Sequence, residues 1–203
     1  MLTLPVTIRI PTASELPHRD DIQELLAKRK AANITEGYII HPNKTPQLHF
    51  EFSAEININN NKLWELFLTL AGDMPGEISC TYGLYDDEAI TTDPFPFEDI
   101  IRKLTVFHKE LTMDCSLEFG LLHHTKEVLT EIFVSESKYI KYWGGNKTRF
   151  LQHMNNFNLT EVPNIAFIDE YPKIIRPLRD FIPSARKPEE VIWGLNRAFQ
   201  VEN

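Results

Sequence analysis

The most concentrated chemistry in the sequence is a run of three carboxylates, Asp86-Asp87-Glu88, in a segment without cations. From Leu63 through Ile101 there are nine acidic residues and neither Lys nor Arg. Carboxylates at this density are too costly to bury together, so we expect an exposed acidic loop. Such a loop can engage a basic protein, because opposite charges steer encounter and orientation. A solvated loop that only aids solubility is the alternative.

We predict a partner-binding surface that combines these carboxylates with two aromatic residues beside prolines. Phe95 and Phe97 would act as anchors, since buried aromatic side chains often dominate binding energy. The predicted partner-binding residues are Asp73, Glu77, Asp86, Asp87, Glu88, Asp93, Phe95 and Phe97. A Ca²⁺ or Mg²⁺ site is less favoured, because the ligand spacing and central glycine of an EF-hand loop are missing. We therefore predict no metal site.

A weaker candidate is an anion-binding turn made by Gly144, Gly145, Asn146 and Lys147. A Gly-Gly turn that enters a helix N-terminus can present backbone N–H groups to an anion. The sequence departs from a phosphate-binding loop, because Asn146 precedes the lysine and the leading glycine is absent. The alternative is an ordinary strand-to-helix turn in which Asn146 caps the helix.

Catalytic and metal motifs are missing from the sequence. It contains no G-x-S-x-G, G-x-x-x-x-G-K-[ST], H-E-x-x-H or G-x-G-x-x-G pattern. The adjacent His123 and His124 would point to opposite faces of a strand, so they are poorly placed to bind one metal ion. We predict no catalytic residue and no cofactor. An enzyme remains an alternative because catalytic groups can assemble from distant residues.

Composition favours a single folded domain, residues 1–203. The chain has 203 residues, a hydrophobic content of 42% and a formal net charge of −8. No apolar stretch is long enough to span a bilayer, and no basic segment precedes the first apolar residues, so we expect a soluble, cytoplasmic protein. Cys80 and Cys115 stand far apart in apolar runs and are expected to be buried thiols. The negative charge argues against nucleic acid and anionic membranes as partners.

The pattern of apolar residues predicts an α+β fold. Alternating residues predict strands near 3–10, 37–41, 48–52, 78–85, 117–121, 128–134 and 138–143, and Ile56 and Ile58 can extend the strand at 48–52. Helical spacing predicts helices near 16–32, 63–70, 97–111, 146–154 and 189–200. Consecutive strands indicate hairpins, so we expect a mixed or mainly antiparallel sheet of about six to seven strands, packed against five to six helices. Segment 170–203 is interrupted by prolines and only partly helical.

The functional hypothesis is a soluble domain whose acidic surface engages a basic protein partner. The distribution of charge supports it, because cations gather in the chain's last part while carboxylates dominate its middle. An immunity-type inhibitor of a bacterial toxin is one possible protein of this kind, by analogy of type alone. The alternatives are an enzyme or small-ligand-binding protein with a site built from scattered residues, and a subunit that contributes an apolar interface near residues 139–143.

Overall fold

Alternating apolar residues form one large antiparallel sheet in the computed structural model, which describes residues 2–17, 19–45 and 47–201. Its strands are β2 (Gly37–Pro42), β3 (Phe52–Asn57), β4 (Glu77–Leu84), β5 (Ile90–Thr91), β6 (Phe95–Pro96), β7 (Leu117–His124), β8 (Leu129–Val134) and β9 (Ile140–Gly144). The order across the sheet is β2-β3-β9-β8-β7-β4-β5, and β6 pairs with β4 beyond the end of β5. The predicted α+β class with a mainly antiparallel sheet is confirmed.

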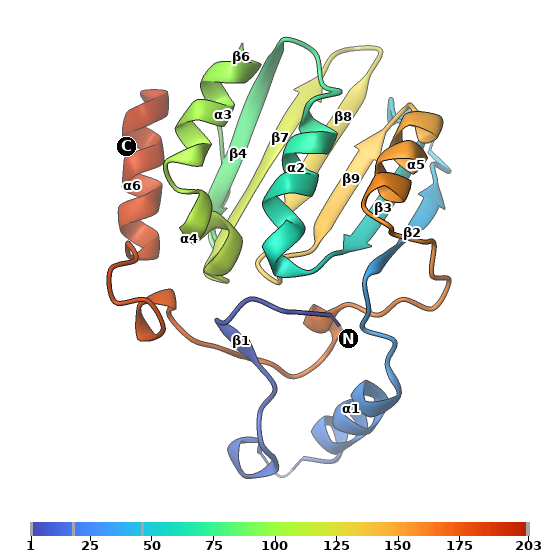
Figure 1. Cartoon of the computed structure of the whole chain (residues 1–203), viewed down its shortest axis with the longest axis vertical. Helices are drawn as coiled ribbons and strands as arrows, with labels where there is room; N and C mark the ends of the chain where they lie inside the picture. Colours follow the sequence, from blue (N-terminus) through green and yellow to red (C-terminus); the bar gives the residue numbers. More distant parts are fainter. Residues whose placement is uncertain (1, 18, 46, 202–203) are drawn as a thin grey trace.

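Six α-helices accompany the sheet in the described part of the chain. They are α1 (Asp20–Ala31), α2 (Leu63–Ala71), α3 (Phe97–Thr105), α4 (His108–Met113), α5 (Lys147–Asn156) and α6 (Pro188–Phe199). Short 3₁₀ turns occupy Ala13–Glu15, Asn60–Lys62, Ile168–Glu170 and Leu178–Asp180. Figure 1 shows α2, α3, α4 and α5 in front of the sheet and α6 beside its β4 edge. The helices therefore cover one face of the sheet.

The strand period decides which side chains meet the helices. In β3, Phe52, Ala54 and Ile56 are buried, whereas Ser53 and Glu55 between them are only partly covered. The same alternation continues across the paired strands, because directly opposite residues share a face. The main core thus lies between the helices and one face, and the other face is left partly exposed to solvent.

A smaller unit lies below the sheet (Figure 1), where β1 (Ile8–Arg9) pairs with β10 (Ile174–Ile175). Its own core contains Ile8, Cys115 and Ile168. The α1 helix belongs to this end of the molecule. Because β1 and β10 come from opposite ends of the sequence, this unit ties the first residues of the chain to the proline-rich segment before α6.

Two expected elements differ from the structure at identifiable residues. The strand expected near 48–52 begins only at Phe52, because the Asn43 side chain donates hydrogen bonds to the carbonyls of Leu48 (2.8 Å) and Phe50 (2.7 Å) and holds a loop. The helix expected over 97–111 is divided into α3 and α4. At this break the Phe107 ring lies against Gly194 of α6, where a Cβ atom would come within 2.4 Å of it.

The strand expected over 3–10 is also shorter than predicted, since only Ile8 and Arg9 pair with a partner strand. The terminal helix is confirmed, with Pro188 in its first turn. The cysteines lie apart in the fold. Cys80 is on β4 opposite Leu121, while Cys115 precedes β7, and both are buried and free.

Candidate partner-binding surface

The carboxylates of Asp86, Asp87 and Glu88 are presented by the tight connection between β4 and β5. The Asp87 N–H donates to the Leu84 carbonyl (3.1 Å), which closes the turn. Asp86 has a φ of 75°, a left-handed conformation that Asp tolerates better than most residues. All three acidic residues are exposed. The predicted acidic loop is therefore a short turn, and residues 85–88 are called the acidic turn below.

Tyr85 shows that further carboxylates converge on this turn. Its side chain is 45% exposed, and its pKa is raised by the negative charges of Asp86 and Glu136, and to a lesser extent by those of Glu118 and Asp169. These residues come from four separate segments of the sequence. Antiparallel pairing brings the first three together, because the end of β4, the start of β7 and the β8–β9 turn lie at the same end of the sheet, and Asp169 is linked to this end through Tyr139.

Behind the turn, Glu136 is fixed by a local network. It is buried and accepts hydrogen bonds from Lys173 Nζ (2.6 Å) and Ser137 Oγ (2.7 Å). Burial alone would raise the pKa of Glu136, but these hydrogen bonds outweigh it and the pKa is lowered. Asp169 accepts a hydrogen bond from the Tyr139 hydroxyl (2.9 Å). The Lys173–Glu136 pair thus joins segment 170–203 to the acidic end of the sheet.

The exposed carboxylates of the acidic turn differ from Glu136 in their partners. Among the ion pairs of the described residues, none includes Asp86, Asp87 or Glu88. Three cations of the last segment pair with other carboxylates, namely Lys173 with Glu136, Arg176 with Asp180 and Arg186 with Glu110. The negative charge of the turn is therefore available to another molecule.

The structure does not gather all the predicted partner-binding residues at this end. Glu77 and Phe95 pair with each other's strands at the opposite end of β4, and Asp93 lies between the two ends. At about 3.3 Å per residue, β4 separates its ends by about 23 Å. The acidic turn and the group around Glu77 are therefore two places along one sheet edge.

Phe95 and Phe97 also differ from the exposed anchors that we predicted. Both are partly buried against the main core. The Phe95 ring packs on Phe199 with centroids 5.5 Å apart, and Lys103 Nζ lies 4.1 Å from the Phe95 centroid. These aromatic residues fasten α3 and α6 to the sheet edge. The exposed aromatic side chain beside the carboxylates is Tyr85, which was not among the predicted anchors.

Asp73, the remaining predicted carboxylate, is paired with basic side chains of the same chain. Its Oδ1 lies 3.0 Å from Arg149 Nε, and its Oδ2 lies 2.6 Å from His153 Nε2. It lines a pocket of about 270 Å³ together with Gly145 and Asn146 from the predicted anion-binding turn. The structure thus combines residues from two predicted sites in one small polar pocket.

The glycine turn has a structural reason of its own. A Cβ atom on Gly144 would lie 2.4 Å from the Tyr142 hydroxyl, so only glycine fits. Asn146 caps α5 by accepting the Arg149 N–H at 2.9 Å, as the alternative interpretation expected, and Lys147 begins the helix as an exposed residue. Burial and the Asp73 charge raise the pKa of Tyr142 to about 12, so its hydroxyl stays protonated at neutral pH.

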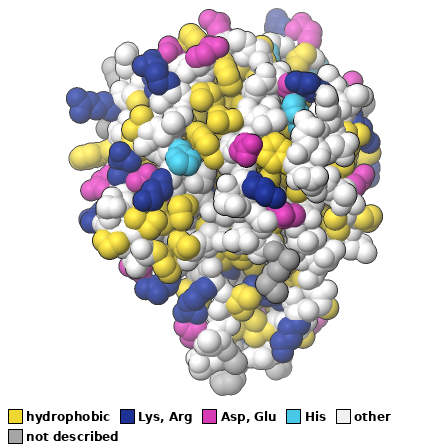
Figure 2. All heavy atoms as spheres, viewed as in Figure 1, with side chains coloured by type: hydrophobic (Ala, Val, Ile, Leu, Met, Phe, Trp, Pro, Cys, Tyr) yellow, Lys and Arg dark blue, Asp and Glu magenta, His cyan; other side chains and the backbone are white. Residues whose placement is uncertain are grey.

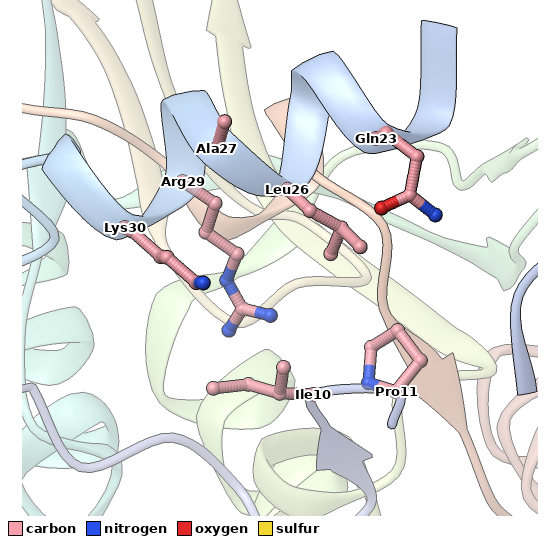
Figure 3. Close-up of a pocket in the computed structure, with 7 residues that line it drawn as sticks. All are labelled: Ile10, Pro11, Gln23, Leu26, Ala27, Arg29 and Lys30. Carbon is pink, nitrogen blue, oxygen red and sulfur yellow. The ribbon is translucent and has the colours of Figure 1, made fainter. Parts of the chain in front are cut away.

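A larger cavity, of about 700 Å³, lies between α1 and the residues after β1. Figure 3 shows Arg29 and Lys30 extending from α1 towards Ile10 and Pro11. Burial lowers the pKa of Arg29, whose Nη1 reaches the Pro172 carbonyl at 3.4 Å. This cavity is apolar and cationic, the reverse of the acidic turn, and it contains none of the predicted site residues.

Charge on the helix-bearing side of the molecule is mixed. Figure 2 shows Lys and Arg side chains interspersed with Asp and Glu side chains over this face, so the expected separation of charge does not extend across it. At the acidic turn, by contrast, the three adjacent carboxylates of Asp86, Asp87 and Glu88 are exposed together.

Two further kinds of site were checked against the described residues, a metal centre and a membrane-spanning helix. His123 and His124 lie on β7 with different surroundings, and His123 Nδ1 is 3.3 Å from the Glu77 carbonyl oxygen. In the part of the chain that the structure describes, no three metal-ligating side chains are grouped. None of its helices has the length and apolar character needed to cross a membrane. Comparisons with family models, curated proteins and solved structures gave no match.

Proposed function

We propose that this protein binds a basic protein partner through the acidic turn. The observation that supports the proposal is the exposed, unpaired state of Asp86, Asp87 and Glu88 beside the exposed ring of Tyr85. Carboxylates that no internal cation neutralises attract a basic surface and orient it during encounter. Tyr85 adds an amphipathic aromatic contact of the kind enriched in interfaces. Neutralisation of a basic toxin by an immunity-type inhibitor is one role that this chemistry would suit.

The small polar pocket gives weaker support to the alternative of an enzyme or small-ligand-binding protein. It has a protonated Tyr142 hydroxyl, but its cation, Arg149, is already paired with Asp73. A neutral pair offers little net attraction for a charged ligand. The acidic turn, whose charge lacks such a partner, supports protein binding better.

The proposal is tested by neutralising the turn without changing its shape. The variant Asp86→Asn/Asp87→Asn/Glu88→Gln should bind a fluorescent oligolysine peptide about tenfold more weakly, since three exposed ion pairs of about 0.5 kcal/mol each sum to about 1.5 kcal/mol. The salt dependence of binding should fall as well. Fluorescence anisotropy at low and at physiological salt measures both effects, and any natural partner can then replace the peptide.

A matched control removes the same charge elsewhere. The variant Glu65→Gln/Glu98→Gln/Glu189→Gln neutralises three exposed carboxylates outside the turn. It should retain most of the peptide affinity, because attraction by remote charges is screened within about 10 Å. Equal losses in the two variants would mean that only net charge matters, and the proposal for the acidic turn would then be rejected.

A further inference from the structure

The helix-free face of the sheet carries an aromatic residue and a carboxylate side by side. On this face Trp143 of β9 stands directly opposite Glu131 of β8, and Glu131 stands opposite Leu122 of β7. All three side chains are half-buried although no helix covers them in the described part of the chain. Directly opposite side chains on one face have Cβ atoms about 5 Å apart, so Trp143 and Glu131 can contact one ligand together.

Phe133 adds a further apolar side chain beside Glu131. It lies two residues further along β8 and opposite Gly120. A Cβ atom on Gly120 would come within 3.1 Å of the Phe133 ring and 2.6 Å of the Ile132 carbonyl, so the ring spreads over the glycine backbone. Glu131 therefore lies among Trp143, Leu122 and Phe133, and Lys141 stands directly opposite Phe133 on the same face.

Glu131 is a half-buried carboxylate that receives no compensation from a neighbouring cation. Its pKa is raised by burial alone, and no ion pair among the described residues includes it. Lys141, which stands directly opposite Phe133, has its Nζ 5.4 Å from the Tyr139 centroid and lowers the pKa of Glu118, whereas burial is the only cause that shifts the pKa of Glu131. Covering an unpaired carboxylate is costly, so a cation from another molecule would relieve the cost.

We propose that Trp143 and Glu131 receive an arginine side chain of the basic protein partner. A guanidinium group can stack on the indole while it donates two hydrogen bonds to the carboxylate, a combination that the compact lysine ammonium cannot match. This inference rests on the proposed function, because it assigns an anchor to the same partner. The two places are connected along β7, since Glu118 lies on the open face of this strand with Gly120 and Leu122 and also contributes to the field at Tyr85.

Fluorescence of Trp143 provides a direct test. The sequence has three tryptophans, so Trp64→Phe/Trp193→Phe leaves Trp143 as the only one. This variant is titrated with an oligoarginine peptide and with a peptide in which every arginine is replaced by neutral, isosteric citrulline. Oligoarginine should give a saturable change in Trp143 emission, and the citrulline peptide should give none. Equal responses to both peptides, or to oligolysine at equal affinity, would overturn the assignment of an arginine site.

The role of the carboxylate is tested in the same background. Glu131→Gln should weaken oligoarginine binding at least about tenfold, because it removes the ion pair from a partly desolvated site. Glu55→Gln is the matched control. Glu55 lies on the same face but is already paired with His41 at 3.4 Å, so its loss should change the affinity less than about twofold. Thermal unfolding establishes that each variant is folded.

The acidic-turn variant separates this inference from the proposed function. If Asp86→Asn/Asp87→Asn/Glu88→Gln weakens the binding of oligoarginine and Glu131→Gln does not, the arginine site is rejected and the function of the acidic turn stands. If only Glu131→Gln weakens binding, the arginine site stands and the role of the turn is rejected. If neither variant affects binding, both proposals fail.

Discussion

The two faces of the sheet differ in composition, although the residues that form them alternate along the same strands. On β8, Ile132 is fully buried against the helices, while its neighbour Phe133 is half-buried on the open face. On β9 the same contrast separates Tyr142 from Trp143. The covered face consists of interlocking apolar side chains. The open face mixes aromatic residues with carboxylates, so stability is concentrated on one side and recognition chemistry on the other.

A second contrast separates two glutamates, one on this open face and one in the turn at its end. Glu136 is buried at the β8–β9 turn with Lys173 at 2.6 Å, and its pKa is lowered. Glu131, five residues earlier, has its pKa raised because burial acts on it without a compensating charge. Burial acts to raise the pKa of both carboxylates, and the net direction depends on whether a cation and hydrogen-bond donors are paired with the group. One glutamate belongs to the structural framework, and the other is placed for an external cation.

The difference between the faces predicts the largest stability effect. Ile132→Ala should lower the free energy of unfolding by about 2–5 kcal/mol, since it leaves a cavity in a fully packed core. Phe133→Ala removes a larger side chain but should cost only about 1 kcal/mol, because the ring is already partly hydrated. Urea denaturation of both variants gives the comparison. A larger loss for Phe133→Ala would show that the open face also holds the fold together.

The framework glutamate should give the next largest effect. Glu136→Gln breaks a buried pair and leaves Lys173 without its counter-charge, at a cost of about 2–3 kcal/mol at neutral pH. Because the pKa of Glu136 is lowered by folding, its stabilisation is present above the ordinary carboxyl pKa and is lost as pH falls through the lowered value. The stabilities of wild type and variant should therefore converge in acid, as measured by denaturation across a pH series.

A double variant tests the cause of that loss. Glu136→Gln/Lys173→Met removes the stranded ammonium together with its partner, so it should recover part of the stability lost in the single variant. Retention of the full loss in the double variant would place the cause in the hydrogen bond to Ser137 instead.

The elements that the sequence predicts well are those with a local cause. The α6 helix follows from Pro188 and the spacing of its apolar residues, and β4 and β8 follow from short apolar runs. The errors occur where a specific side-chain contact decides, whether that contact is local or distant in sequence. Asn43 turns residues 48–51 into a loop through its side-chain hydrogen bonds, and Gly194 receives Phe107 where the predicted long helix breaks. Neither contact has a signature in the local pattern.

The candidate site was predictable only in part for the same reason. The carboxylates of the acidic turn are adjacent in sequence, so their exposure could be inferred from charge density alone. Glu118 and Asp169 join them through strand pairing and through the hydrogen bond from Tyr139, which are invisible in one dimension. Asp73 was grouped with these carboxylates because it lies in the same cation-free segment of the sequence. In the structure it is paired with Arg149, a residue 76 positions away.

The smallest expected effect is the most specific, because its sign is opposite to that of the framework glutamate. Glu131→Gln should raise the free energy of unfolding at neutral pH by about 0.5 kcal/mol, since it replaces an unpaired, partly desolvated carboxylate by a neutral amide. A folded pKa above the unfolded value means that the folded state holds its proton longer. Wild-type stability must then fall as pH rises from the unfolded to the folded pKa of Glu131. The variant has no carboxylate at this position, so its stability lacks this fall.

The pH series consequently distinguishes the two glutamates without any partner protein. The difference between Glu131→Gln and wild type should vanish in acid, where both side chains are neutral, and grow as pH rises past the ordinary carboxyl pKa. For Glu136→Gln the variant is the less stable protein over the same range. A loss of stability in Glu131→Gln at neutral pH would mean that an internal donor already binds the carboxylate. Glu131 would then belong to the framework, and the arginine site would lose its physical basis.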